Sequence, residues 1–197
     1  MKKALLVLPE IMETDRLILR SYRPGDGPIF YRAGIRNFDH LSEFESGNIL
    51  FHLKNEDHSE NVVKDLSAKW KSGKYFFIGL FDKINNEWAG QLYVSPTNPE
   101  LPEFTLGFAA DVNYEGKGYM GEAVNRVLEV LFKHMNIHRV ISDCHEKNIR
   151  SIRLLERCGF IREGHLRDNK RNHDGSFHGD YLYGLLHNEY LNKQHKK

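Results

Sequence analysis

Three closely spaced glycines, Gly116, Gly118 and Gly121, stand just before the most regular helical pattern in the chain and constrain its fold more than any other feature. Glycine lets a backbone take left-handed conformations and approach a ligand closely. The first turn of a helix adds unpaired N–H groups and a partial positive charge. This combination predicts an anion-binding loop of the kind that holds a phosphate or pyrophosphate. A glycine-rich turn into an ordinary core helix is the alternative that the spacing alone leaves open.

The segments around this loop alternate between strand and helix patterns. Apolar residues recur at helical spacing over 120–135, and a second helix over 149–158 has Asn148 as its N-cap and Gly159 at its C-terminal end. Strand patterns occupy the stretches 16–20, 75–81, 88–94, 104–110, 139–144, 160–162 and 181–186. The order of these elements predicts an α/β (α+β) single domain built on a mixed sheet.

Other parts of the sequence have weaker patterns. A helix is expected over 29–37, and another begins after an N-cap at Ser59 and ends at Gly73. Residues 38–58 are polar and have no clear period. A second group of irregular segments comprises a loop marked by Pro96, Pro99 and Pro102 and a polar connection at 167–179.

Length and composition limit the possible functions. The 197 residues suit one domain spanning 1–197, with 1–13 as a short leading segment and 190–197 as a polar tail. A net charge of +1 argues against direct nucleic-acid binding through phosphate charge. No apolar run reaches the ~18 residues of a membrane helix. Two cysteines are too few for a disulfide framework, which favours a reducing, cytoplasmic location.

The eleven histidines of the chain are scattered. Only His134 and His138 have the i, i+4 spacing of a helical metal site, and no carboxylate stands beside them in a metalloprotease pattern. Surface or capping roles are more common for such residues than metal binding. The sequence therefore predicts no metal site.

The glycine spacing also matches the dinucleotide-binding fingerprint. Asp143 follows at about the 20-residue distance of a ribose-binding acid. However, residues 111–115 separate the preceding strand from the first glycine, and too little chain follows for a doubly wound domain. A dinucleotide-dependent oxidoreductase is thus one hypothesis for this chain, and these two departures from the fingerprint weaken it.

Several groups of residues recur in the order typical of one family. They are Thr14-x-Arg16-Leu17-x-Leu19-Arg20, Gly107-Phe108, Gly116-Lys117-Gly118-Tyr119-x-x-Glu122-Ala123, Asn136-Ile137-His138-Arg139-Val140, Asn148-x-x-Ser151-x-Arg153-x-Leu155-Glu156-x-x-Gly159-Phe160, Glu163-Gly164-x-Leu166-Arg167 and Asp180-x-x-Tyr183-x-Leu185-Leu186. This set resembles the GNAT superfamily of acyl-CoA-dependent N-acetyltransferases, and most closely its branch that acetylates ribosomal-protein N-termini. The resemblance covers nearly the whole chain.

The resemblance implies a mostly antiparallel sheet in which two neighbouring strands, 104–110 and 139–144, splay apart to admit the pantetheine arm of acetyl-CoA. It implies acetyl transfer to a primary amine by direct attack in a ternary complex, with acetyl-CoA as co-substrate. Ser151 would be the general acid near the sulfur, and Glu103 a possible base acting through water. The implied cofactor-binding residues are Phe108, Ala109, Ala110, Gly116, Lys117, Gly118, Tyr119, Met120, Gly121, Asn148 and Arg153.

Each of these roles has a plainer structural alternative. Ser151 sits in a first helical turn, where its hydroxyl can bond the backbone. Asn148 can cap the helix and also bind the cofactor. Lys117 and Arg153 can be solvated charges, and Glu103 a solvated loop acid. A non-catalytic CoA-binding module is therefore a third hypothesis.

Three positions depart from the family pattern that the chain resembles. The family has Gln or Arg where Glu115 stands, and Gly or Ala where Met120 stands. Glu115 puts a negative charge near the expected phosphates, and Met120 narrows the turn. Thr105 replaces a Glu that is frequent in the branch, which leaves the general base open.

The acceptor is expected between the two segments least like the family, 38–58 and 167–179. The first segment is rich in carboxylates and aromatic rings, which favour a cationic amine: Phe38, Asp39, Glu43, Phe44, Glu45, Phe51, Glu56 and Asp57. The second carries Lys170, Arg171 and His173, which would oppose that preference. Two solvated loops without an acceptor role are the alternative. The resemblance places a peptide N-terminus ahead of small-molecule amines, and the protein is expected to be a monomer or homodimer.

Overall fold

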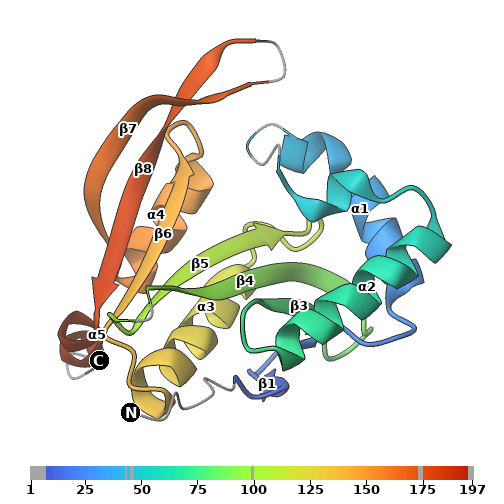
Figure 1. Cartoon of the computed structure of the whole chain (residues 1–197), viewed down its shortest axis with the longest axis horizontal. Coiled ribbons are helices and arrows are strands. Elements are labelled where there is room, and N and C mark those ends of the chain that lie inside the picture. The colour runs from blue at the N-terminus through green and yellow to red at the C-terminus, as the bar shows by residue number, and fades with distance from the viewer. Residues whose placement is uncertain (1–7, 43, 45–46, 99, 173–174, 195–197) are drawn as a thin grey trace.

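The chain folds into one eight-stranded sheet with helices on both faces, as described by a computed structural model for residues 8–42, 44, 47–98, 100–172 and 175–194 (Figure 1). The strand order is β1-β2-β3-β4-β5-β6-β8-β7. All neighbouring strands are antiparallel except β5 and β6. The strands are β1 (Ile11–Glu13), β2 (Leu17–Ser21), β3 (Phe76–Asp82), β4 (Trp88–Asn98), β5 (Glu103–Ala110), β6 (Arg139–His145), β7 (Ile161–Arg171) and β8 (Phe177–Leu186). The mixed sheet predicted from the sequence is confirmed.

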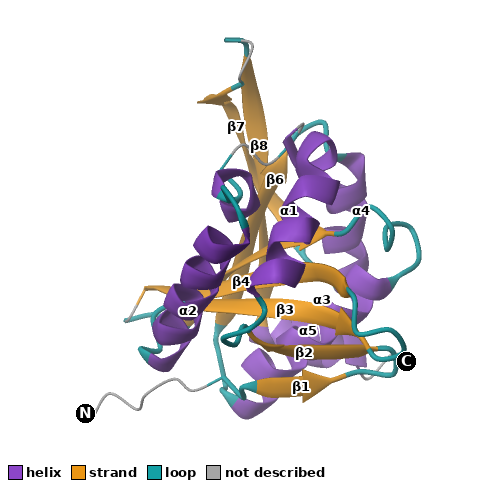
Figure 2. Ribbon diagram, turned by 90° about the vertical axis from the view of Figure 1, so that its right-hand side faces the viewer, coloured by secondary structure: helices purple, strands orange, loops and turns teal. Residues whose placement is uncertain are grey.

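Helices form two layers around this sheet. One layer holds α1 (Gly27–Ser42), the short 3₁₀ turn η1 (Ile49–His52) and α2 (Glu56–Lys71). Its core includes Phe30, Val63 and Ala109. The other layer holds α3 (Tyr119–Glu129), the π-helical turn η2 (Val130–His134), α4 (Ile149–Cys158) and α5 (His187–Gln194). Figure 2 shows the sheet between these layers and the long β7–β8 hairpin rising from it.

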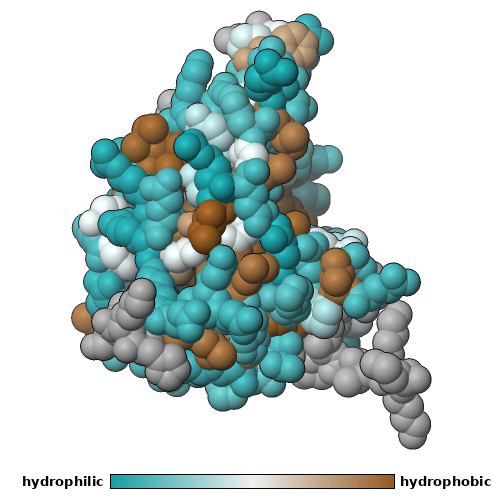
Figure 3. Space-filling view, turned by 90° about the vertical axis from the view of Figure 1, so that its left-hand side faces the viewer, coloured by the Kyte–Doolittle hydropathy of each residue, from teal (hydrophilic) through white to brown (hydrophobic). Residues whose placement is uncertain are grey.

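The outer surface is mostly hydrophilic. On the face shown in Figure 3, apolar side chains stand singly among hydrophilic ones. No helix formed by the described residues is long and apolar enough to cross a membrane. Within the same residues, no three His, Cys, Asp or Glu side chains gather in a way that could hold a metal ion.

The parallel strands β5 and β6 pair over only three residues. Glu103, Phe104 and Thr105 face Arg139, Val140 and Ile141, and no pairing of β5 with β6 follows in the described chain. Figure 1 shows the two strands diverging from this point. Every later residue of β5 remains paired with β4 on its other side. The splayed strand pair implied by the family resemblance is therefore present.

A buried carboxylate anchors α1 to the end of β5. Asp111 is fully buried, and its Oδ2 accepts hydrogen bonds from Arg36 Nε at 2.9 Å and from Asn37 Nδ2 at 2.9 Å. The Asn37 amide oxygen in turn accepts from Val112 N at 2.8 Å. Asp111 N donates to Ala89 O of β4. This network fixes α1, β4 and the segment entering the glycine loop in one arrangement.

Several boundaries differ from the sequence prediction. Ser59 is not the N-cap of α2: it is buried inside the helix, and Asn55 caps it by accepting from His58 N at 2.7 Å. The helical pattern over 120–135 divides into α3 and the π-helical turn. Residues 190–194 lie in α5 rather than in a tail, since Tyr190 is buried and stacks on Phe132.

Two segments expected to be irregular are strands. β4 continues through Pro96, which pairs with Phe104. The polar stretch 167–179 forms the distal part of β7 and β8, with register shifts between Arg162 and Gly164 and between Leu166 and Lys170. Its side chains are mostly exposed on β7, so the alternation of apolar and polar residues that marks a half-buried strand is missing. Residues 173 and 174 lie outside the described chain.

The Asp111 network is predicted to contribute strongly to stability. We expect Asp111→Ala to lower the free energy of unfolding by about 2–4 kcal/mol, because it leaves a partly buried Arg36 charge unpaired. The value is below that of a fully buried pair because Arg36 keeps 33% of its side chain exposed. Urea unfolding followed by circular dichroism measures it. Asp39→Ala, at an exposed position of the same helix, should change stability by less than about 0.5 kcal/mol; equal effects of the two changes would contradict the anchoring role.

Candidate active site

A cavity of about 320 Å³ lies beside the carboxyl end of β5, between the glycine loop, the starts of α3 and α4, and the end of α1. We call it the loop cavity. Its walls combine backbone from the glycine loop with basic side chains from α4 and apolar ones from α1 and β5. The lining residues are His40, Leu41, Phe44, Phe108, Ala110, Tyr114, Glu115, Gly116, Gly118, Met120, Gly121, Asn148, Arg150, Ser151, Arg153, Leu154 and Arg157.

The glycine loop has the backbone geometry that its sequence predicts. Gly116 and Gly118 have φ of +70° and +84°, a region that favours glycine, and Gly118 is the N-cap of α3 without a side-chain cap. A Cβ placed on Gly116 would meet nothing within 4 Å. The loop therefore turns without filling the space above it, and N–H groups at the start of α3 are free of a capping side chain.

Arg16, at the start of β2, holds this loop from below. Its guanidinium donates to Lys117 O at 3.0 Å and to Glu122 Oε2 at 2.7 Å, and it lies 4.0 Å from the centroid of the Tyr119 ring. Burial raises the pKa of Glu122, but hydrogen bonds from Thr14 and Arg16 outweigh it and lower the pKa below its usual value. The ion pair thus fixes the first turn of α3 near neutral pH.

Asn148 and Ser151 begin α4 at the edge of the loop cavity. Asn148 Oδ1 accepts from Ser151 N at 3.1 Å, so the capping role predicted for Asn148 is present. Its side-chain nitrogen and the Ser151 hydroxyl have no hydrogen-bond partner among the described residues, and both residues line the cavity. Ser151 Oγ is therefore available to a ligand.

Basic residues from α4 dominate the charge of the cavity. Arg150, Arg153 and Arg157 all line it, and Glu115 is its only acidic residue among those described. The Glu115 carboxylate does not stand alone: His40 Nε2 lies 2.8 Å from Oε1, and Arg150 Nη1 lies 3.5 Å from Oε2. Glu115 therefore links α1, the glycine loop and α4 across the cavity.

The structure brings most of the predicted site residues together. Phe108, Ala110, Gly116, Gly118, Met120, Gly121, Asn148, Ser151 and Arg153 line the loop cavity. Lys117, Tyr119 and Ala109 do not. Lys117 Nζ donates to Asn113 O at 2.7 Å, Tyr119 stacks under Arg16, and Ala109 faces the opposite side of the sheet. The binding and catalytic roles of all these residues stay predictions.

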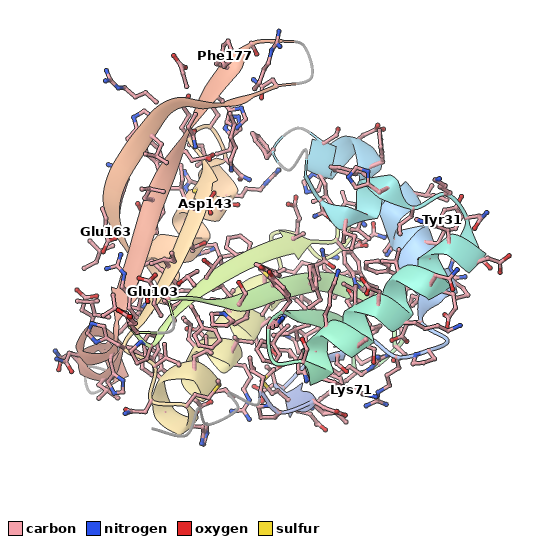
Figure 4. All side chains as sticks on the ribbon, viewed as in Figure 1. Tyr31, Lys71, Glu103, Asp143, Glu163 and Phe177 are labelled. Carbon is pink, nitrogen blue, oxygen red and sulfur yellow. The ribbon has the colours of Figure 1, made fainter. Side chains whose placement is uncertain are left out.

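Glu103 lies away from this group. It begins β5 at the closed end of the β5–β6 pair, whereas the loop cavity is at the other end of the strand (Figure 4). Its carboxylate accepts from Thr97 Oγ1 at 2.7 Å and pairs with Arg139 Nε at 3.1 Å. The structure does not bring Glu103 and Ser151 to one place.

Asp143 does not lie on the loop cavity either, although the dinucleotide hypothesis required it to hold a ribose. It pairs with Lys170 Nζ at 3.2 Å on β7. At Asp143, β6 has passed the three residues that pair in parallel with β5, and it pairs antiparallel with β8, where Asp143 faces Leu182. These contacts favour an acetyl-CoA site over a dinucleotide site.

Sequence reasoning missed the contribution of α1. His40 and Leu41, near the end of α1, line the cavity because the Asp111 network fixes the helix beside it; Phe44, just beyond α1, lines it too and was named in the sequence analysis only as an aromatic residue near the acceptor. No local pattern in residues 38–58 indicates this placement. Arg150, Leu154 and Arg157 carry a usable signal, since their i, i+4, i+7 spacing puts them on one face of α4.

Two histidines, His145 at the end of β6 and His178 on β8, adjoin the cavity through Phe44, which lines it. His145 stacks on His178 with ring centroids 4.0 Å apart and contacts Phe44, whose ring centroid is 5.1 Å away. Burial lowers the pKa of His145, which keeps the imidazole neutral near pH 7. Its Nδ1 accepts from Lys147 N at 3.0 Å, so Nε2 carries the proton.

A family model matches most of this chain. Residues 16–161 match the family model described as "Acetyltransferase (GNAT) domain". This match covers most of the chain, and the chain therefore belongs to the GNAT acetyltransferase family. The branch suggested by the sequence is supported by its relatives.

Curated relatives are similar over different parts of the chain. The uncharacterized N-acetyltransferase YnaD of Bacillus subtilis is 36% identical over 44% of this chain and 51% of its own length. The ribosomal protein uS5-alanine N-acetyltransferase of Escherichia coli is 31% identical over 50% of this chain and 51% of its own length. The chain thus spans about half the length of these two relatives. The prophage-derived uncharacterized N-acetyltransferase YokL of B. subtilis is 26% identical over 89% of this chain and 93% of its own.

Solved structures share the fold. The ribosomal-protein-S5-alanine acetyltransferase of Vibrio fischeri superposes with a TM-score of 0.80 at 22% identity, covering 91% of this chain and 98% of that one. RimL, described as a ribosomal L7/L12 α-N-protein acetyltransferase in complex with coenzyme A, superposes with a TM-score of 0.81 at 19% identity. This superposition covers 90% of this chain and 98% of that one.

The position of Glu115 predicts an unusual electrostatic effect. We expect Glu115→Gln to lower the Kd for coenzyme A about fivefold at low salt, because a carboxylate near the incoming phosphates is removed and Arg150 is released. The gain should shrink at high salt. Calorimetric titration at two salt concentrations measures it. Glu87→Gln, an exposed carboxylate outside the cavity, is the matched control; an unchanged or raised Kd for Glu115→Gln alone would refute the idea.

Proposed function

We propose that this protein transfers an acetyl group from acetyl-CoA to a primary amine, on a peptide N-terminus or a small molecule, by direct attack in a ternary complex. The observation that carries the proposal is the loop cavity, in which the glycine loop, the basic face of α4 and the Ser151 hydroxyl meet beside the diverging end of β5. Membership of the GNAT family supports the same activity.

The cavity suits the phosphates and thiol arm of acetyl-CoA. N–H groups at the start of α3 and the helix dipole favour a pyrophosphate, and Arg153 and Arg157 add positive charge. The pantetheine arm would continue along Phe108 and Ala110, where β5 has left β6 and its backbone groups are free to pair with an amide. RimL, which has the same fold, is described in complex with coenzyme A, and this supports acetyl-CoA as the co-substrate.

The reaction needs few groups from the protein. A neutral amine attacks the thioester carbon, the C–S bond breaks, and the amine proton passes to water. Ser151 Oγ would donate a proton to the departing sulfur and regain one from solvent. Because a thiol has a pKa near 8.5, this acid has a modest task, and much of the rate would come from positioning the two reactants.

The test of the proposed function is binding and turnover in one series. Wild-type protein should bind acetyl-CoA in calorimetry and release free thiol with at least one member of a panel of peptide N-termini, amino acid amides and polyamines. Gly116→Asp should abolish binding while circular dichroism shows an unchanged fold, since a side chain there points into open space at the loop cavity and adds bulk and like charge. Tight binding of acetyl-CoA by the folded variant would remove the loop from the site. Binding of NADH but not acetyl-CoA by the wild type would overturn the proposal.

Ser151→Ala is predicted to act on the rate. We expect kcat to fall by up to ~10²–10⁴-fold, the range of one acid–base group, with a smaller change in the KM for acetyl-CoA, since the proton is needed only as the thiolate leaves. Ser151→Thr keeps the hydroxyl and should retain more activity. Steady-state thiol release measures both variants; a raised KM with unchanged kcat would make Ser151 a binding residue instead.

A further inference from the structure

A second cavity lies on the face of the sheet opposite the loop cavity. It measures about 550 Å³ and sits over β3, β4 and β5, beside η1 and α2. We call it the aromatic cavity. Phe108 lines both cavities, and Ala109 lines this one, so the two are separated only by the end of β5. An amine held here would stand where β5 and β6 have already parted, facing the expected position of the thioester.

The floor of the aromatic cavity consists of three rings. Phe77 and Tyr93 pair across β3 and β4 with ring centroids 5.0 Å apart, and Tyr75 stacks on Tyr93 at 6.3 Å. Gly107 of β5 pairs with Tyr93 of β4. A Cβ on Gly107 would meet Tyr93 atoms only at 3.7 Å or more. A side chain at 107 would therefore fit but would fill the space over the ring. The glycine keeps that space for a ligand.

One buried amide points its donors into this cavity. Trp88 Nε1 donates to Tyr22 Oη at 2.9 Å, and Tyr22 Oη donates to Gln91 Oε1 at 3.2 Å. An indole nitrogen can only donate, so the Tyr22 oxygen accepts from it and its single proton goes to Gln91. Burial raises the pKa of Tyr22, which keeps that proton in place.

This relay fixes the orientation of the Gln91 amide. Its oxygen is used by Tyr22, and its nitrogen has no hydrogen-bond partner among the described residues, although Gln91 is only 6% exposed. Because Gln91 lines the aromatic cavity, the two N–H groups are available to a ligand oxygen there. Gln91 Nε2 is not one of the fully buried side-chain atoms that lack a partner, so solvent reaches it and a ligand oxygen would take the place of water as its acceptor.

The charge of the cavity disfavours a polycation. None of the described residues that line it is acidic, and Lys69 stands at its edge. Lys69 Nζ pairs with Asp65 at 2.7 Å and keeps 44% of its side chain exposed. Of the carboxylates expected to attract a cationic amine, Glu43 and Glu45 lie outside the described residues. Glu56 pairs with Arg32 instead, and Asp39 and Asp57 are exposed and line neither cavity.

We propose that the aromatic cavity is an acceptor subsite for amines that carry a carbonyl or carboxylate oxygen beside an apolar or aromatic group, and that Gln91 selects them by donating to that oxygen. The inference rests on the proposed acetyl transfer. An α-amino acyl group has this chemistry, whether it begins a peptide or belongs to a free amino acid. A polyamine has no oxygen for Gln91 and meets the charge of Lys69.

Phenylalaninamide and phenethylamine form the central pair of the experiment, because they differ only in the carboxamide. Gln91→Glu keeps the oxygen that Tyr22 needs and replaces the donor with a negative charge. We expect this variant to lower kcat/KM for phenylalaninamide by about 10–100-fold relative to phenethylamine, and to raise kcat/KM for spermidine. Comparing the ratio between wild type and variant cancels the different basicities of the two amines. Asn192→Asp, an exposed amide-to-acid change on α5, should leave all ratios unchanged.

Lys69→Gln separates the two sources of the oxygen. It should raise the KM for free phenylalanine and leave that for phenylalaninamide or a peptide unchanged. If Gln91→Glu lowers kcat/KM equally for every amine, Gln91 has a structural role and the subsite proposal is wrong. A wild-type preference for spermidine over phenylalaninamide overturns it as well.

A binding measurement distinguishes failure of this inference from failure of the proposed function. Phenylalaninamide should bind to the complex of wild-type protein with coenzyme A in calorimetry, and at least tenfold more weakly to that of Gln91→Glu. Such binding without turnover of any amine would refute acetyl transfer and uphold the subsite. Turnover of amines, together with equal binding of phenylalaninamide by wild type and Gln91→Glu, would uphold acetyl transfer and refute the subsite.

Discussion

The parting of β5 and β6 after three paired residues is the constraint on which the site depends. Strand backbone must find partners, and a continuous ladder would leave nothing for a ligand. Here β5 stays paired with β4 along its whole length, so the strand is held rigid on one edge while the other edge opens beyond Thr105. The opening joins the two faces of the sheet at Phe108, which lines a cavity on each. The proposed acetyl transfer would then take place across the sheet.

Two ion-pair networks keep the parts around this opening in place. Asp111 ties α1 to the end of β5, and Arg16 ties the start of β2 to the glycine loop and α3. Both join segments that are far apart in the sequence, and both act on backbone that surrounds the loop cavity. The glycines can therefore supply an open, left-handed turn without making the loop loose, because the order comes from side chains outside it.

The sequence prediction was correct for features that depend on residues close together in the chain. The strand alternation, the helix ends at Asn148 and Gly159, and the glycine loop depend on neighbours within a few residues, and each is found in the structure. Ser59 was misplaced as a cap because Asn55 offers the same chemistry four residues earlier. The distal part of the β7–β8 hairpin, expected as a polar connection at 167–179, was missed because both sides of β7 face solvent and no period results.

Long-range contacts explain what the sequence could not show at the site. The position of His40 beside Glu115 follows from the way α1 packs, and nothing within residues 38–58 encodes it. The orientation of Gln91 depends on Trp88 and Tyr22, one on its own strand and one 69 residues earlier. Conversely, Glu103 has a suitable residue type on a suitable strand, yet β5 carries it to the closed end of the pair and Arg139 neutralises it there. Residue type and strand assignment therefore do not show which other side chains a residue will lie beside in the folded protein.

The two cavities, on opposite faces of the sheet, differ in chemical character. The loop cavity is basic and bounded by backbone, so it is suited to phosphates, and its shape depends on glycines and on the start of two helices. Among the described residues that line the aromatic cavity, only Phe108 also lines the loop cavity. On the two proposals above, substitutions at Tyr75, Tyr93 or Gln91 would change which amine binds and leave the residues of the loop cavity unaltered.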